Sequence, residues 1–135
     1  MKITDIDSHL LQLFRKGTVI PATPLALTKL RTVDEKYQKA LVRYHIDCGV
    51  GGIAIGVHST QFEIREHGLF EGLLSLVSEE IDKWSEFRGG KKILKIAGVC
   101  GKTEQALKEA TFASSTGYHA ALVSLSALKE NSWMN

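Results

Sequence analysis

Gly49-Val50-Gly51-Gly52-Ile53-Ala54-Ile55-Gly56, at residues 49–56, is the stretch that decides the fold. Residues 53–55 are apolar at every position, which is typical of a strand covered on both faces, as in a parallel sheet. Gly49 stands where a preceding helix would end, because a helix commonly ends in a left-handed conformation that glycine adopts without strain. A helix directly before a buried strand predicts a parallel α/β protein.

The helix before this stretch is expected to begin after Asp34, whose carboxylate suits an N-cap position. Apolar and aromatic residues then recur at steps of three and one, which predicts one buried helix face. That predicted inner face consists of Tyr37, Ala40, Leu41, Tyr44, His45 and Cys48.

Two further strand and helix units follow the stretch. A long helix is predicted with an inner face made of Leu69, Phe70, Leu73, Leu74, Val77, Ile81 and Trp84. Gly89-Gly90 ends it, and residues 92–99 form the next strand. Thr103 is the predicted N-cap of a helix that Gly117 ends, with Ala106, Leu107, Ala110 and Ala113 inward. Residues 120–125 form the last predicted strand.

On the N-terminal side, residues 18–22 are predicted to form the first strand, which stops at Thr23-Pro24 because proline lacks a backbone donor. Residues 1–17 form a short helical extension, capped by Ser8 and ended by Gly17. The main domain therefore spans residues 18–135, with a βαβαβαβ order that repeats about every 35 residues. Such units usually close as a ring of roughly 250 residues, so the 135 residues are interpreted as the first half of a (β/α)8 barrel.

Composition excludes several classes of partner. Lys and Arg number 17 and Asp and Glu 15, so the net charge of +2 gives no indication of nucleic acid or an acidic membrane. The apolar run at residues 10–14 is too short for a membrane span. Two cysteines and no secretory signal predict reduced thiols and a cytoplasmic protein. No cofactor and no metal site are predicted, because no spacing of metal ligands stands out.

The candidate binding residues lie in the loop after the second predicted strand. This loop lies at the carboxyl end of the strand, where barrels of this type place their chemistry. Gly56, His58, Ser59 and Thr60 are the candidates for binding a substrate carboxylate or passing a proton. The alternative is a polar loop in which Ser59 or Thr60 caps the next helix.

Lys95 and Cys100 carry weaker alternatives. A lysine inside an apolar strand suits a Schiff-base nucleophile. A lysine whose amine reaches out to solvent, or one paired with a carboxylate at the base of the barrel, fits its position better. Cys100 ends the third strand on the same side as His58, where the two side chains would form a nucleophilic or metal-binding pair. The alternative for Cys100 is a small residue at a strand end.

An ordered set of segments resembles the dihydrodipicolinate synthase and N-acetylneuraminate lyase family over residues 17–126. These are the strand that ends in Thr23-Pro24, Asp34 with the glycines of residues 49–56, and three segments further on: Ile96-Ala97-Gly98-Val99, Thr103-Glu104-Gln105-Ala106 and residues 113–123.

The resemblance implies a TIM barrel with class I aldolase or lyase chemistry on pyruvate or another 2-oxo acid. In that family the Schiff-base lysine lies on a strand beyond residue 135. A Thr-Thr pair and a tyrosine relay protons, but Val57-His58 and Ser126-Ala127-Leu128 stand in their places here. No catalytic residue is therefore assigned, and this chain alone is expected to be inactive in that reaction.

Two alternatives to a lyase remain. An open four-stranded sheet leaves the outer edges of its first and last strands unpaired. The chain would then form a homo-oligomer or recruit a separate C-terminal half-barrel as an assembly module. A truncated gene product without function is the other alternative.

Overall fold

The computed structural model describes residues 2–128 and contains a three-stranded parallel sheet in the order β1-β2-β3. The strands are β1 (Gly52–Ile55), β2 (Leu94–Val99) and β3 (Ala120–Val123). Helix α3 (Phe70–Phe87) connects β1 to β2, and α4 (Thr103–Ser115) connects β2 to β3. The predicted parallel α/β fold is confirmed.

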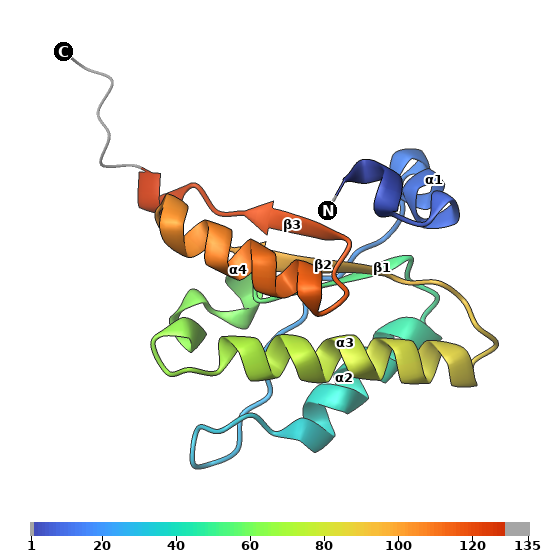
Figure 1. Cartoon of the computed structure of the whole chain (residues 1–135). Coiled ribbons are helices and arrows are strands. Elements are labelled where there is room, and N and C mark those ends of the chain that lie inside the picture. The colour runs from blue at the N-terminus through green and yellow to red at the C-terminus, as the bar shows by residue number, and fades with distance from the viewer. Residues whose placement is uncertain (1, 129–135) are drawn as a thin grey trace.

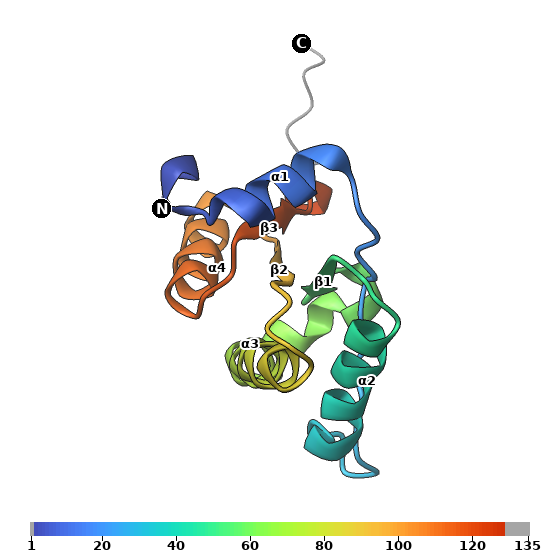
Figure 2. The ribbon, with the colours of Figure 1, turned by 90° about the vertical axis from the view of Figure 1, so that its right-hand side faces the viewer.

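The main core lies between the sheet and its helices. Figures 1 and 2 show α3 and α2 (Glu35–Asp47) on the same side of the sheet, with α4 beside β3. Ile53 and Ile55 of β1 face this layer and are fully buried. Burial of side chains of this size stabilises the fold by about 1.5–3 kcal/mol each. Their partners on α3 are Leu73, Leu74, Val77 and Ile81.

Helix α1 (Ser8–Lys16) lies at the amino-terminal end of the strands (Figures 1 and 2). Its Leu10 is buried, and Asp7 forms an ion pair with Lys92, just before β2. The N-cap is Asp7 and not the predicted Ser8: the Asp7 carboxylate accepts the N–H of Leu10 at 3.3 Å and that of His9 at 2.9 Å. A carboxylate at this position also interacts favourably with the helix dipole.

The first predicted strand, residues 18–22, does not form a regular strand. It runs beside β1 and makes one isolated parallel bridge to Ala54. Thr23 donates its N–H to the Ala54 carbonyl at 2.8 Å, and Ala54 donates to the Pro21 carbonyl at 3.0 Å. The next bond of a parallel ladder would need a donor at Pro21 facing the Gly52 carbonyl. Proline has none, so this bond is missing and the ladder is interrupted. The two segments are joined again only by the N–H of Gly51, which donates to the Val19 carbonyl at 3.1 Å.

The predicted inner face of α2 is wrong by one residue. The buried residues are Gln38, Val42 and Ile46, whereas Tyr37 and Tyr44 are 62% and 64% exposed. Cys48, expected in the core, is exposed as well. A buried glutamine explains the error: the Gln38 side-chain oxygen accepts the N–H of Ala26 at 2.8 Å, so a polar residue occupies an inward position.

The start and the inner face of α4 also differ from the prediction. Thr103 is the first helical residue and Lys102 is the N-cap, without a side-chain hydrogen bond. Leu107 is 63% exposed, while Glu109 and Ala113 are buried. A carboxylate therefore occupies an inward position on this helix.

Candidate functional site

The loop after β1 lies at the carboxyl end of the sheet. We call residues 56–61 the rim loop; it begins at Gly56 and passes through a short 3₁₀ turn, His58–Thr60. Gly56 has a φ of 73°, a conformation that favours glycine, and the chain turns away from the sheet there. The β/α order thus places the loop where the sequence predicted it.

The four predicted binding residues have different environments. The Thr60 hydroxyl is fully buried: it donates to the Thr23 carbonyl at 2.7 Å and accepts the N–H of Gly56 at 3.1 Å. His58 and Ser59 are exposed, and the His58 ring packs edge-on against Phe62 with a centroid distance of 5.8 Å. Thr60 therefore holds the loop, and His58 and Ser59 project from it.

The alternative prediction, that Ser59 or Thr60 caps the next helix, is wrong. The residue at the N-cap of α3 is Leu69, and no side chain bonds to the helix start there. A second short turn, Phe62–Arg65, separates the rim loop from α3.

The ends of β1 and β2 approach each other closely beside the rim loop. A Cβ atom placed on Gly98 would lie 2.2 Å from the Gly56 carbonyl oxygen, so only glycine fits there. The regular pairing ends one step earlier, at Ile55 with Ala97. The two carbonyl groups of these glycines are left at the edge of the sheet.

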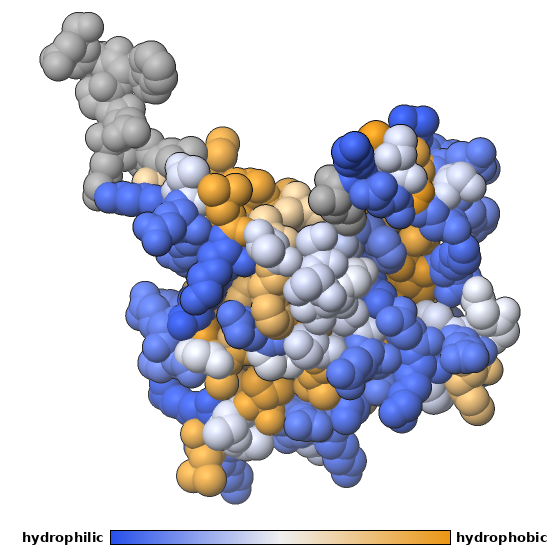
Figure 3. Space-filling view, in the orientation of Figure 1, coloured by the Kyte–Doolittle hydropathy of each residue, from blue (hydrophilic) through white to orange (hydrophobic). Residues whose placement is uncertain are grey.

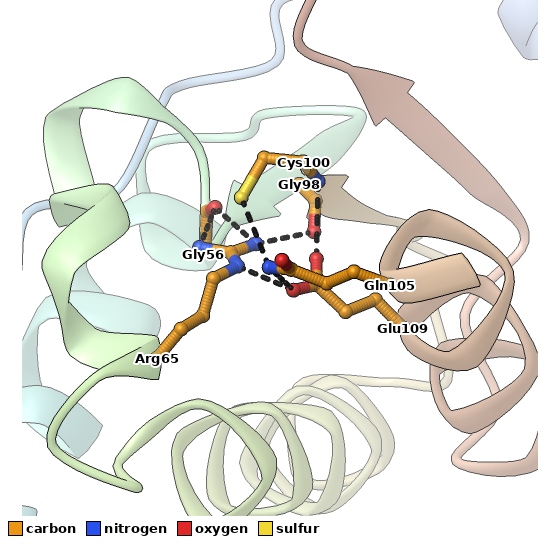
Figure 4. Close-up of polar contacts among 6 residues, drawn as sticks. All are labelled: Gly56, Arg65, Gly98, Cys100, Gln105 and Glu109. Carbon is orange, nitrogen blue, oxygen red and sulfur yellow. Dashed lines mark hydrogen bonds and ion pairs between the residues drawn. The ribbon is translucent and has the colours of Figure 1, made fainter. Parts of the chain in front are cut away.

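Arg65 bonds to both of these carbonyl groups, as Figure 4 shows. Its Nη2 lies 3.0 Å from the Gly98 oxygen and 3.3 Å from the Gly56 oxygen. Its Nε lies 2.8 Å from Oε1 of Glu109, and the guanidinium stacks on the Phe70 ring at 4.2 Å. Arg65 therefore connects the ends of two strands to α4.

Glu109 has hydrogen-bond partners on both carboxylate oxygens. Oε1 accepts from Arg65 and from Nε2 of Gln105, each at 2.8 Å, and Oε2 accepts the N–H of Cys100 at 3.0 Å (Figure 4). The sequence analysis identified neither Arg65 nor Glu109. The available signal was a glutamate four residues before the inward-facing Ala113, a spacing that places both on one helix face.

A cleft of about 620 Å³ opens beside this pair, lined by residues that include Phe62, Phe70 and Cys100. Cys100 is buried, and this burial raises the pKa of its thiol, which disfavours the reactive thiolate. Within residues 2–128 no group of three or more His, Cys, Asp or Glu side chains is arranged to hold a metal ion.

Lys95 lies on the face of the sheet that the helices cover. It pairs in register with Ile53, which faces the helices. Its Nζ donates to Asp82 at 2.6 Å and to Ser78 at 3.0 Å, both on α3. Of the three interpretations of Lys95, the structure shows the lysine paired with a carboxylate; its side chain is only 6% exposed, so the amine does not extend to solvent.

His119 lies next to Lys95. The His119 Nδ1 accepts the backbone N–H of Lys95 at 3.0 Å. Burial and then the Lys95 charge lower the pKa of His119, so the neutral ring is favoured.

In the described part of the chain, no helix combines the length and apolar character needed to cross a membrane. No protein-family model and no curated protein matches the sequence.

Solved structures do match the fold. The chain is similar to a dihydrodipicolinate synthase with 20% identity and a TM-score of 0.65, over 79% of this chain and 35% of that one. CdNal from Clostridium difficile, in complex with mannosamine, has 19% identity and a TM-score of 0.66, over 78% of this chain and 34% of that one. Dihydrodipicolinate synthase from Aquifex aeolicus has 24% identity and a TM-score of 0.59, over 78% of this chain and 33% of that one. The chain thus has the fold of part of a TIM barrel and spans about a third of the length of these structures.

Proposed function

We propose that this chain forms the first half of a lyase-type (β/α)8 barrel and that its rim loop binds the carboxylate of a small 2-oxo acid. One observation carries the proposal. His58 and Ser59 are exposed on a loop that the Thr60 hydroxyl and Arg65 hold at the carboxyl end of β1. Active sites of such barrels lie at this end of the sheet. The similarity to solved dihydrodipicolinate synthases supports a 2-oxo acid as the substrate class.

The rim loop supplies binding groups and no nucleophile. The Ser59 hydroxyl and a ring N–H of His58 each donate a hydrogen bond to a carboxylate oxygen. Schiff-base formation needs a lysine amine facing the lumen, and Lys95 faces α3 instead. The proposal is therefore that this half binds the acid and that further barrel strands supply the reacting amine.

Pyruvate is expected to shift the backbone amide signals of Gly56, His58 and Ser59 in a two-dimensional NMR titration. The signals of residues at the amino end of the strands are expected to stay in place. The double substitution of His58 and Ser59 by Ala is expected to weaken binding at least tenfold, because both side-chain donors are lost. His9→Ala, an exposed histidine on α1, is the matched control and should leave the titration unchanged.

Acetone serves as the ligand control, because it has the carbonyl of pyruvate without the carboxylate. Equal shifts with acetone and pyruvate, or no shift at the rim loop, would contradict the proposal. Borohydride treatment of the chain with pyruvate is expected to leave its mass unchanged. An adduct on Lys95 would show that the amine leaves Asp82 and reacts.

A second candidate function, an assembly module, is supported by the surface around β3. Leu122 and Val123 point to opposite faces of this edge strand, yet they are 59% and 54% exposed, and Leu125 is 67% exposed. Figure 3 shows hydrophobic residues gathered along the upper side of the molecule, over β3. Exposed apolar edges of this kind are typical of surfaces that pair with another chain.

Replacing Leu122 and Leu125 by Glu is expected to convert a dimer or larger species into a monomer, because charges on an apolar interface oppose association. Light scattering on a gel-filtration column measures the mass. Leu30→Glu is the control, since Leu30 is 87% exposed in a turn far from β3 in the chain. A wild-type chain that is already monomeric would exclude homo-oligomeric assembly.

A further inference from the structure

The Arg65–Glu109 pair is a buried ion pair at the carboxyl end of the sheet. The two side chains are only 10% and 8% exposed. Transfer of two charges out of water is costly, and apolar residues of similar size often stabilise a protein as well as a buried pair does. Stability alone is therefore a weak explanation for this pair, and its geometry indicates a more specific role.

The geometry of the pair concerns the start of the rim loop. The N–H of Gly56 donates to the Thr60 hydroxyl, and its carbonyl accepts from both terminal nitrogens of Arg65. Both peptide groups that flank the Gly56 Cα are thus held, at a residue with a φ of 73°. The φ and ψ angles of Gly56 set the direction in which the chain leaves β1 and hence the position of His58 and Ser59.

We infer that Arg65, oriented by Glu109, is a positioning residue that fixes the rim loop and its two exposed side chains. The planar guanidinium presents several N–H donors in a fixed fork, which an ammonium group lacks. Arg65 uses this fork to bond Glu109 and the carbonyls of both strand ends at once. The consequence for the 2-oxo acid rests on the proposed function, whereas the consequence for the order of the loop does not.

Lys95 and Asp82 form a second ion pair between the sheet and a helix, and they provide a matched comparison. Lys95 is 6% exposed in its side chain, but its amine bonds α3 and no strand-end carbonyl. Removal of this pair is expected to loosen the fold as a whole. Removal of the Arg65 fork is expected to loosen the rim loop in particular.

Backbone amide hydrogen exchange tests the inference. The reporters are the N–H groups of Gly56, Thr60 and Gln61, which donate to the Thr60 hydroxyl and to the carbonyls of Val57 and His58. In Arg65→Lys these amides are expected to exchange at least tenfold faster, relative to amides of α3 in the same protein. In Lys95→Met the ratio between the two groups of amides is expected to stay within about threefold of wild type.

Glu109→Gln keeps the shape of the side chain and provides a second variant should Arg65→Lys fail to fold. The amide nitrogen of glutamine cannot accept from Arg65 or Cys100, so the same selective loss of protection is expected. A uniform rise in exchange across the protein in both variants, or no change at the rim loop, would overturn the inference.

A pyruvate titration of the same variants separates this inference from the proposed function. Arg65→Lys is expected to bind pyruvate at least fivefold more weakly than Lys95→Met at a temperature where both are folded. If the wild-type chain does not bind pyruvate, the proposed function fails while the exchange result still decides the inference. If wild type and Arg65→Lys bind equally well, the positioning role is wrong.

Discussion

Gly98→Ala is expected to destabilise the protein by more than about 3 kcal/mol, beyond the usual range for overpacking. The new Cβ would lie 2.2 Å from the Gly56 carbonyl oxygen, 2.4 Å from its carbon and 2.7 Å from the nitrogen of Val57. All three are backbone atoms at the end of a strand, so no side-chain rotation relieves the contact. The ends of β1 and β2 would have to separate, and Arg65 would lose at least one of the two carbonyls that it bonds.

Gly72→Ala is the matched control, because a Cβ there would meet no atom within 4 Å. Gly72 lies inside α3, where alanine is favoured over glycine by about 1 kcal/mol. Urea unfolding followed by circular dichroism measures both variants. We expect the midpoint to rise for Gly72→Ala and to fall steeply for Gly98→Ala. A Gly98→Ala protein as stable as wild type would contradict the close approach of the two strands.

The sequence predicted those parts of the fold in which neighbouring residues in the chain carry the information. β1 is buried at every position, because the helices cover one face and Ala54 packs against Ile20 and Ile96 on the other. Gly49, with a φ of 82°, marks the end of α2 as expected. The prediction of a first strand at residues 18–22 was wrong for a local reason that is visible in the sequence. Pro21 removes the donor that the next ladder bond would need, whereas the prediction placed the end of pairing only at Pro24.

The predicted inner faces of α2 and α4 were wrong because contacts with distant parts of the chain decide which residues are buried. Gln38 is inward because its side chain bonds the backbone of the segment at residues 24–26. Leu107 is outward because Glu109 takes the inward position. A count of apolar residues cannot recognise a polar residue whose partner lies elsewhere in the chain.

The candidate site divides in the same way. The rim loop was located from the order of strands and helices, since a loop after a parallel strand must lie at the carboxyl end of the sheet. The roles within it depend on partners far apart in the chain: Thr60 bonds a carbonyl 37 residues away, and Arg65 bonds a carboxylate 44 residues away. Neither distance corresponds to a sequence pattern, so the framework of the loop appeared only in the structure.

Arg65→Met is expected to lower the free energy of unfolding by about 3–5 kcal/mol, because it leaves the Glu109 carboxylate buried without its cation. The side chains are 10% and 8% exposed, so water does not compensate for the loss. The double variant Arg65→Met with Glu109→Leu is expected to be at least about 2 kcal/mol more stable than Arg65→Met, since no uncompensated charge remains. Urea unfolding of the wild type, both single variants and the double variant gives the coupling energy.

The same single and double substitutions at the exposed pair Lys39 and Glu35 on α2 are the control. Their coupling energy is expected to be small, because ion pairs at the surface contribute about 1 kcal/mol or less. A double variant as unstable as Arg65→Met would contradict the argument from desolvation.

The double variant of Arg65 and Glu109 also separates stability from positioning. It recovers stability without any donor for the Gly56 and Gly98 carbonyls, so its rim-loop amides should still exchange faster than in wild type. Restored stability with an unprotected loop is the combination that a purely structural ion pair would not produce.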